Sequence, residues 1–405
     1  MKKHYKIILV LFYFIIFASV FSFIVPVFES PDENLHLDFI NYVTIYKSLP
    51  NQYEGMQNKE KYVGQGHQHP LYYILTSFIN YGLNSGDKIE VNPRLNKLHI
   101  WNRGTEKYVP VYNNTCESFF NSVNYKYTFY VLRLLSVLFG AVNIFFVYKI
   151  SYLLTSNEMF SSLSAFILGS LPQFAYISGM INNDNMANMM STICLYLALR
   201  LFNDGYSRRI IIILGITLGL ALLTKKTLVF LIPGILMLFL YKSVFIDKEF
   251  ISSFKHLSVI LFIAFIISFW ILIRNYIVYN EPFGTQMEIN TMSQLVDKKS
   301  LFSFYFIYPF TPGLLYSFIG SFGWLTLRLP VFIYLFYLLL VLTAIFGFVK
   351  SRFIRNKFQP NNFVIMIVFI VICFSGILYF NLTFRQYQGR YMFPAASFIS
   401  IILAM

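Results

Sequence analysis

Long apolar runs recur along the whole chain, and most of them are as long as a helix that crosses a bilayer. A membrane-spanning helix needs about 20 consecutive apolar residues. The first run covers about residues 7–28. The others lie at about 127–150, 159–180, 186–202, 209–223, 227–241, 257–279, 330–349 and 362–382, and a last one runs from near Met392 to Met405. This spacing predicts an all-α polytopic membrane protein, a helical bundle of about 10 transmembrane helices.

The composition supports the same fold class. Of 405 residues, 57% are hydrophobic, 20% aromatic and 12% charged, which excludes a soluble globular domain. The net charge of +14 does not indicate nucleic acid, because most basic residues fall in short loops between apolar runs. In such loops they orient the chain and meet anionic headgroups. We therefore expect membrane lipids, and no nucleic acid, among the partners.

The basic residues also predict an orientation. The first run is too long for a signal-peptide core and has no clear cleavage site, so we expect a retained helix with a cytoplasmic N-terminus. Counting crossings from there places these basic residues inside: Lys149, Arg208, Arg209, Lys242, Lys248, Lys255, Lys350, Arg352, Arg355 and Lys357. The chain is expected in the cell (inner or plasma) membrane. The last run is short for a crossing, which leaves open whether the chain is a fragment that lacks later helices.

Two polar segments are expected on the outer side of a single transmembrane domain, residues 1–405. The first external loop covers residues 29–125 and the second covers 280–329. Within the first loop, the amphipathic stretch from His69 to Leu75 predicts an interfacial helix. Because a long ordered loop is usually functional, we expect the first loop to form one wall of the active site.

Two adjacent carboxylates, Asp32 and Glu33, follow the first apolar run. Locally, Ser30 is a plausible N-cap, and Glu33 falls where a capping box places its acid. The spacing puts Asp32, Glu33 and His36 on one helical face. A well-capped interfacial helix fits this pattern as well as a catalytic site does. Paired acids at a membrane boundary are costly to keep without a use, which favours a functional role.

Several external basic residues oppose the orienting trend, so they are candidates for binding a lipid phosphate. Lys225 and Lys226 lie in a turn between two runs, where snorkelling to headgroups is an equally good interpretation. Arg274 lies inside an apolar run, where a charged side chain normally faces a cavity or a partner. Arg385 and Arg390 flank Gly389, which can let the backbone approach a phosphate closely.

Other polar groups fall on the same predicted side. Asn182, Asn183 and Asp184 form a compact turn, and a purely structural turn is the favoured interpretation. His67 and His69 lie in the first loop, where histidines more often bond the backbone or a substrate than a metal. A divalent cation, Mg²⁺ or Mn²⁺, held by Glu33, His36 and His69 is the alternative, although no strong metal motif is present.

Five motifs, taken in order, resemble the GT-C superfamily of membrane glycosyltransferases, and more closely a bacterial membrane-protein family within it. They are Pro31-Asp32-Glu33 with His36, His69-Pro70-Leu71-Tyr72-Tyr73, Asn182-Asn183-Asp184, Ser321-Phe322-Gly323-Trp324 and Gln388-Gly389-Arg390-Tyr391. The superfamily includes protein O-mannosyltransferases, aminoarabinose transferases and oligosaccharyltransferases. The resemblance implies transfer of a sugar from a polyprenyl-phosphate-linked donor to an acceptor at the outer face. Asp32 matches the position of the family's catalytic acid and Glu33 its neighbour, whereas the basic residues match only in general location.

The residue chemistry agrees with this implication. Transfer to a hydroxyl of a glycan, lipid or protein needs a base, and the leaving lipid phosphate needs cations. We predict Asp32 as the base of an inverting reaction, with Glu33 orienting the acceptor or binding a cation, although the sequence leaves open which of the two acids is the base. The predicted substrate and phosphate contacts are His36, His67, His69, Asn183, Asp184, Lys225, Lys226, Arg274, Arg385 and Arg390. A flippase for a lipid-linked glycan and a non-catalytic assembly protein are the alternatives, although no inverted repeat favours a transporter.

Overall fold

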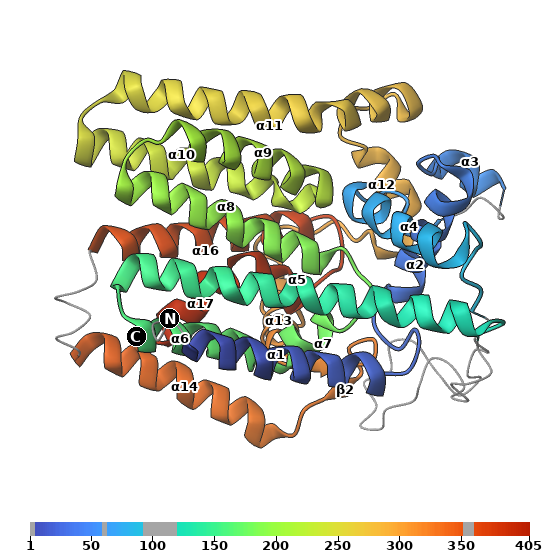
Figure 1. Ribbon diagram of the computed structural model, residues 1–405, viewed down its shortest axis with the longest axis horizontal. Helices are drawn as coiled ribbons and strands as arrows, with labels where there is room; N and C mark the ends of the chain where they lie inside the picture. Colours follow the sequence, from blue (N-terminus) through green and yellow to red (C-terminus); the bar gives the residue numbers. More distant parts are fainter. Residues whose placement is uncertain (1–4, 59–62, 92–119, 351–359) are drawn as a thin grey trace.

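Long helices packed side by side form the body of the protein. The computed structural model describes residues 5–58, 63–91, 120–350 and 360–405. The bundle contains α1 (Tyr5–Ile24), α5 (Val123–Thr155), α6 (Glu158–Gly169), α7 (Pro172–Ser178), α8 (Asp184–Asp204), α9 (Arg208–Thr224), η3 (Lys226–Phe230), α10 (Leu231–Tyr241), η4 (Lys242–Asp247), α11 (Phe250–Tyr279), α14 (Val331–Lys350), α16 (Pro360–Asn381), η7 (Gly389–Ala395) and α17 (Ala396–Leu403). Figure 1 shows both chain termini at one end of this bundle.

Each of the predicted apolar runs lies in helical structure. Among the described residues, five helices are long and apolar enough to cross a membrane by length and composition. A sixth is added if α6 and α7, which meet at 70°, are counted as one span. The bend falls at Leu171, because Pro172 starts α7 and cannot continue the hydrogen bonds of α6. The predicted polytopic all-α fold is confirmed; the count of 10 stays a prediction.

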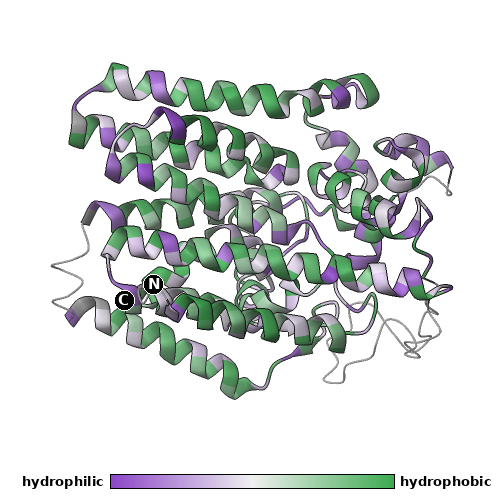
Figure 2. Cartoon of the chain, in the orientation of Figure 1, coloured by the Kyte–Doolittle hydropathy of each residue, from purple (hydrophilic) through white to green (hydrophobic). Residues whose placement is uncertain are grey.

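Most residues of the long helices are hydrophobic, and hydrophilic residues are more frequent in the short elements (Figure 2). In α1, 22% of the most apolar window is buried, against 50% in α5, which crosses the middle of the bundle. Close packing between α9 and α11 depends on two small residues. A Cβ atom at Gly215 would lie 2.8 Å from Ile263, and one at Gly219 would lie 2.7 Å from Ile267. This spacing of glycines lets two apolar helices approach closely.

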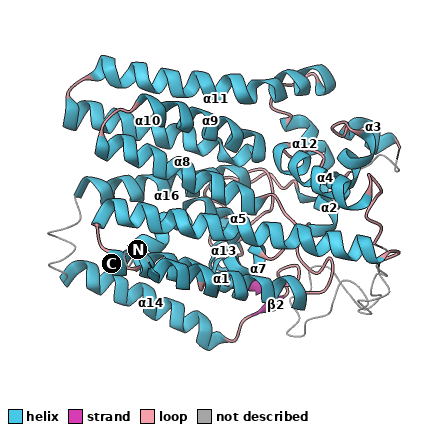
Figure 3. Cartoon of the chain, viewed as in Figure 1, coloured by secondary structure: helices cyan, strands magenta, loops and turns pink. Residues whose placement is uncertain are grey.

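A group of short helices lies at the end of the bundle opposite the termini (Figures 1 and 3). From the first predicted loop come α2 (Glu33–Tyr46), α3 (Gln52–Gln57) and α4 (Leu71–Asn84), which confirms the helix expected near His69. From the second come α12 (Thr285–Thr291), η5 (Ser293–Leu295), η6 (Phe304–Phe306), α13 (Phe310–Ile319) and the antiparallel strands β1 (Ser321–Phe322) and β2 (Leu327–Arg328). Residues 92–119 of the first loop, and Arg352, Arg355 and Lys357, lie outside the described residues.

The predicted cap of α2 is wrong. The helix begins at Glu33, and the residue before it, Asp32, has a left-handed backbone with φ of 67° and makes no capping bond with its side chain. Ser30 contributes only its backbone carbonyl, which accepts from the N–H of Glu33 at 3.3 Å. The capping box fails because the Glu33 carboxylate has other partners, described below. Glu33 therefore does not share the face of Asp32 and His36.

Candidate functional site

Four charged side chains from distant parts of the chain meet at the end of the bundle that carries the short elements. Arg390 donates to Asp32 Oδ2 at 2.6 Å, and its other terminal nitrogen lies 3.4 Å from Asp184 Oδ2. Lys225 Nζ donates to Asp184 Oδ1. We call Asp32, Asp184, Lys225 and Arg390 the charge cluster, and the end of the bundle where it lies the site end. Two carboxylates and two cations thus form one connected network.

The two carboxylates of the charge cluster stand at helix starts. Asp32 immediately precedes α2, and Asp184 is the first residue of α8. The turn before Asp184 is held by Asn182, whose side chain accepts from the N–H of Asn185 at 3.3 Å. A negative charge at a helix N-terminus is stabilised by the unpaired N–H groups there. The turn therefore has its predicted structural role and also carries a charged group of the cluster.

The two cations are placed by breaks in helical structure. Lys225 follows α9 with an extended backbone, so its side chain leaves the helix end. Arg390 lies in η7, which packs tightly on α13 at Gly389. A Cβ atom at Gly389 would lie 2.1 Å from the backbone nitrogen of Phe318. The backbone N–H of Gly389 donates to the hydroxyl of Ser317 at 2.7 Å. The close approach that Gly389 permits is thus made to α13.

Burial within the charge cluster is uneven. The side chains of Arg390, Asp184 and Lys225 are 4%, 8% and 12% exposed, whereas that of Asp32 is 26% exposed. Tyr391 covers the two cations, with its ring centroid 5.6 Å from each of them. The charges are therefore fixed in a dry environment, where electrostatic interactions are strong. Asp32 is the member that a substrate from solvent or membrane can reach most easily.

His36 lies beside the charge cluster as a neutral group. Its Nδ1 is 2.8 Å from the hydroxyl of Tyr73, and the two rings stack. Burial lowers the pKa of His36 to about 3, and the nearby charges of Asp32 and Asp184 offset only part of this effect. At neutral pH the ring can therefore hydrogen-bond a substrate without adding charge.

Glu33 faces away from the charge cluster. Arg133, in the first third of α5, forms two hydrogen bonds with the Glu33 carboxylate at 2.8 and 2.6 Å, and both side chains are completely buried. The carboxylate also accepts from the N–H groups of Phe28 and Ile181. Because the Glu33 side chain has no exposed surface, it cannot contact an acceptor, and the predicted role of orienting the acceptor is not supported. Of the two adjacent acids, only Asp32 belongs to the charge cluster.

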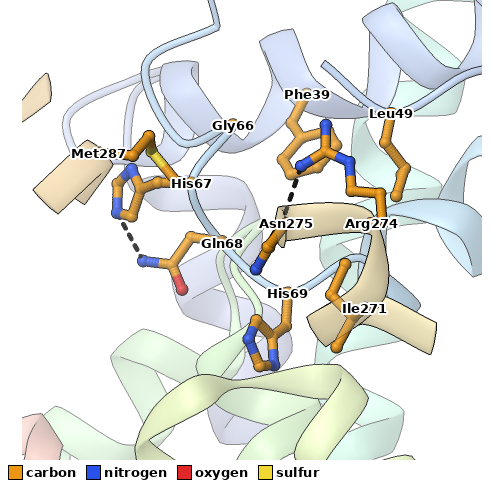
Figure 4. Close-up of a pocket in the computed structure, with 10 residues that line it drawn as sticks. All are labelled: Phe39, Leu49, Gly66, His67, Gln68, His69, Ile271, Arg274, Asn275 and Met287. Carbon is orange, nitrogen blue, oxygen red and sulfur yellow. Dashed lines mark hydrogen bonds between the residues drawn. The ribbon is translucent and has the colours of Figure 1, made fainter. Parts of the chain in front are cut away.

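A small pocket with about 260 Å³ of empty space, part of it open to solvent, adjoins the cluster (Figure 4). It is lined by Phe39, Leu49, Gly66, His67, Gln68, His69, Ile271, Arg274, Asn275 and Met287. Figure 4 shows Arg274 bonded to Asn275 and His67 bonded to Gln68. The pocket therefore brings three predicted binding residues, His67, His69 and Arg274, to one place.

The pocket is joined to the charge cluster through its polar lining. Gln68 accepts from Asn183, the residue before Asp184, at 3.3 Å. His69 Nδ1 bonds the carbonyl of Leu222, near the end of the helix that precedes Lys225. Burial lowers the pKa of both His67 and His69, so these rings are neutral as well. The cationic group of the pocket is Arg274, which donates to the carbonyl of Pro50 at 2.6 Å and to the hydroxyl of Tyr279.

Two predicted cations take other positions. Lys226 pairs with Glu288 of α12 at 2.9 Å and is more exposed than Lys225. Arg385 belongs to the segment after α16, where its backbone N–H donates to the carbonyl of Leu295. Among the described residues, the structure records no ion pair between Arg385 and the charge cluster. Of the five basic residues predicted to bind phosphate, Lys225 and Arg390 lie in the charge cluster and Arg274 lines the pocket, whereas Lys226 and Arg385 lie elsewhere.

The predicted metal ligands are not gathered. Glu33 is bonded to Arg133, and His36 and His69 each use Nδ1 for another partner. Within the part of the chain that the structure describes, no group of three or more His, Cys, Asp or Glu side chains could hold a metal ion.

Sequence reasoning missed two partners of predicted residues, Arg133 and Glu288. Arg133 lies inside an apolar run, and the rule that singled out Arg274 applies equally to it. Glu288 had no such signal, because it stands in a polar loop. Its pairing with Lys226 depends on how the two loops fold together.

The described fold is similar to solved membrane glycosyltransferases of the GT-C type. ArnT from Cupriavidus metallidurans bound to undecaprenyl phosphate matches with a TM-score of 0.59 and 14% identity, over 98% of this chain and 59% of that chain. The same protein in the apo state matches with a TM-score of 0.55 and 14% identity, over 98% of this chain and 58% of that chain. An oligosaccharyltransferase from Archaeoglobus fulgidus, tethered to an acceptor peptide with an NVT sequon, matches with a TM-score of 0.53 and 14% identity. The match covers 100% of this chain and 49% of that chain. The chain thus spans about half to three fifths of the length of these proteins, and the predicted GT-C fold is confirmed.

A comparison with protein families agrees with the membrane character. The family model described as "Predicted membrane protein (DUF2142)" matches residues 99–399. No curated protein matches the chain. With its apolar helices, this identifies a multi-pass membrane protein.

Proposed function

The chain belongs to the DUF2142 family of predicted membrane proteins, and from that premise and its GT-C fold we propose that it is a glycosyltransferase. The proposed reaction moves a sugar from a polyprenyl-phosphate-linked donor to a hydroxyl of a cell-envelope glycan, lipid or protein. The observation that carries the proposal is the charge cluster. A partly exposed carboxylate, Asp32, is bound by the buried Arg390, and Asp184 links Arg390 to Lys225, which is the arrangement expected of a base beside a phosphate site.

In the proposed step, the acceptor oxygen attacks the anomeric carbon while its proton passes to Asp32. The bond from that carbon to the phosphate oxygen breaks, and the polyprenyl phosphate leaves with the electron pair. Arg390 holds Oδ2 of Asp32, so Oδ1 is the oxygen that takes the proton. A single displacement of this kind inverts the anomeric carbon. Positioned bases typically contribute a factor of about 10² to 10⁴ to such a transfer.

The cations serve the leaving group. Lys225 and Arg390 are already fixed by Asp184, so little reorganisation is needed when charge develops on the phosphate. We assign Arg274 to the second anionic or polar part of the donor, because its recorded partners are neutral groups. His36, His67 and His69 are neutral donors or acceptors for the sugar hydroxyls. Two of the structural relatives support this class of ligand, since one was solved bound to undecaprenyl phosphate and the other tethered to an acceptor peptide.

The proposed location of the reaction is the outer face of the membrane. α9 starts at Arg208 and ends beside Lys225, and α8 starts at Asp184 and ends at Asp204, so the charge cluster lies opposite the exposed Arg208 and Arg209. By the positive-inside rule, that basic end is cytoplasmic. A membrane-impermeant thiol reagent would test this: in a Cys116→Ser background of intact cells, Ser300→Cys is expected to react and Asn203→Cys to stay protected. The reverse pattern would contradict the proposed orientation.

The reaction can be tested on purified protein in lipid nanodiscs. Labelled polyprenyl-phosphate sugars and candidate acceptors are supplied, and transfer and the anomeric configuration of the product are measured. The wild type is expected to transfer the sugar with inversion of the anomeric carbon. Asp32→Asn is expected to lose transfer activity, and the control Asp204→Asn, which changes a carboxylate at the other end of α8, is expected to keep it. Retained configuration would contradict the direct displacement. Movement of the donor across vesicles without chemistry would favour a flippase instead.

The proposed mechanism needs no metal ion. The carboxylates of the charge cluster already have cationic partners. Transfer is therefore expected to change less than about twofold when EDTA replaces added Mg²⁺ or Mn²⁺. Loss of transfer on chelation, with recovery on adding back either ion, would show that a divalent cation is required.

A further inference from the structure

The buried pair of Glu33 and Arg133 uses nearly all its hydrogen-bonding capacity. Arg133 gives Nε–H and one terminal N–H to the two carboxylate oxygens. Its remaining N–H groups donate to the carbonyls of Ser22 at 2.7 Å, Val25 at 2.8 Å and Pro26 at 3.2 Å. Glu33 also accepts the N–H of Phe28 at 3.2 Å, and the exposed fraction of both charged side chains is zero.

These bonds connect the segments on which the charge cluster is built. They join the end of α1, the first turn of α2 and the first third of α5, and Glu33 Oε1 also accepts from the N–H of Ile181 at 3.1 Å. Ile181 stands three residues before Asp184, and Glu33 is the residue after Asp32. One buried carboxylate therefore holds the backbone on both sides of the site.

Asp32 needs such support. Its left-handed backbone is unfavourable for a residue with a Cβ atom, and conformations of this kind persist where the surroundings hold them. The neighbouring Glu33 is locked to Arg133 on one side, and the Asp32 carboxylate is bound by Arg390 on the other. The two adjacent acids thus point to separate partners, one inside the bundle and one in the site.

We infer that Glu33 and Arg133 are a positioning pair, which holds Asp32 and Asp184 so that Arg390 can bridge them, and which never touches substrate. This inference rests on the proposed transfer reaction. Stability alone does not account for the pair, because well-packed apolar residues can often replace a buried ion pair without loss of stability. Placement of reacting groups is more demanding, since a shift of about 1 Å can reduce a rate about 10²-fold.

The test compares three variants in nanodiscs. The double variant Glu33→Met/Arg133→Met removes both charges together and leaves neither one buried alone. Arg133→Lys keeps the charge but loses the planar fork that binds both oxygens. The control, Arg200→Met/Asp204→Met, removes an exposed ion pair at the other end of α8. Thermal unfolding, kcat and KM for donor and acceptor are measured for each.

The double variant is expected to lose about 10²-fold in kcat, with KM for the acceptor nearly unchanged. Arg133→Lys is expected to lie between it and the wild type, and the control to match the wild type. A kcat within about threefold of the wild type in the double variant would overturn the inference. A large rise in acceptor KM at constant kcat would also overturn it, because Glu33 would then be a substrate contact.

Hydrogen exchange separates this inference from the proposed function. Even if the wild type transfers no sugar, amides in residues 26–36 and 178–188 are expected to exchange faster in the double variant than in the wild type, and residues 200–208 equally fast. If the double variant does not fold, the same comparison is made with Arg133→Lys. Unchanged exchange in both segments would refute the positioning role.

Discussion

The two ends of the helical bundle both carry many charges, but they hold them differently. At the site end, the pairs of Arg390 with Asp32 and of Arg133 with Glu33 join residues far apart in sequence, and each of these two pairs contains a side chain that is almost or fully buried. At the opposite end, Arg200 and Asp204 pair within one helical turn, with side chains 39% and 43% exposed. Arg208 and Arg209 are exposed there as well.

This difference shows which charges the fold has to match. An exposed pair keeps most of its hydration and contributes about 0 to 1 kcal/mol. A buried charge loses its hydration and must find partners of the correct geometry, so breaking such a pair costs roughly 3 to 5 kcal/mol. The exposed Arg208 and Arg209 at the basic end can orient the chain without any tertiary contact. The buried pairs Arg390–Asp32 and Arg133–Glu33 at the site end form only because distant segments of the chain meet there. This supports a role of the site end in binding and catalysis.

The largest expected effect is that of Asp32→Asn, which removes the proposed base without changing its size. Transfer is expected to fall by about 10² to 10⁴, the range of a positioned general base. Asp204→Asn, at the opposite end, is expected to transfer at the wild-type rate. The measurement is initial transfer rate at saturating donor. Full activity in Asp32→Asn would remove the distinction between the two ends.

Arg390→Lys is expected to have the next largest effect. Lysine keeps the charge, but a single ammonium group cannot bridge Asp32 and Asp184 as the guanidinium does. Transfer is expected to fall roughly 10- to 10²-fold, less than the 10² to 10³ that follows loss of a whole stabilising donor. Arg209→Lys, an exposed arginine at the basic end, serves as the matched control. Equal activity of both variants would argue against a bridging role.

Acid is expected to destabilise the site end. Because the pKa of His36 is lowered by burial from 6.5 to about 3, the unfolded chain binds a proton at a pH where the folded chain does not. This stabilising contribution is present above about pH 6.5 and declines as the pH falls toward 3, by up to about 1.4 kcal/mol per pH unit for one group. His36→Gln should unfold with a weaker dependence on pH between 7 and 4.5, measured by thermal unfolding in detergent. An identical dependence in the two proteins would contradict the neutral, buried state of His36.

The smallest effect is expected for Arg200→Gln. Its ion pair with Asp204 is exposed and spans only four residues, so the free energy of unfolding should change by less than about 0.5 kcal/mol. Transfer should not change. A loss of either stability or activity as large as that of a site-end variant would show that exposure does not separate the two groups of charges.

Membrane character and helical content follow from the sequence because they depend on local composition. Apolar runs of sufficient length form helices in a bilayer wherever they occur, since the backbone must satisfy its own hydrogen bonds there. The position of Asp32 at the end of the first run, and the isolated charges in later runs, could be recognised for the same reason. Arg133 could have been recognised with them.

The pairing of those charges could not be derived in this way. Local spacing put Glu33 on the face of His36 and in a capping box, whereas the carboxylate is bound by Arg133, 100 residues further along the chain. The order of residues is enough to place Asp32 and Glu33 together at the end of a membrane helix. Packing in three dimensions sets which of them is buried within the bundle and which faces Arg390, because a buried charge takes whichever partner the distant helices bring within hydrogen-bonding distance.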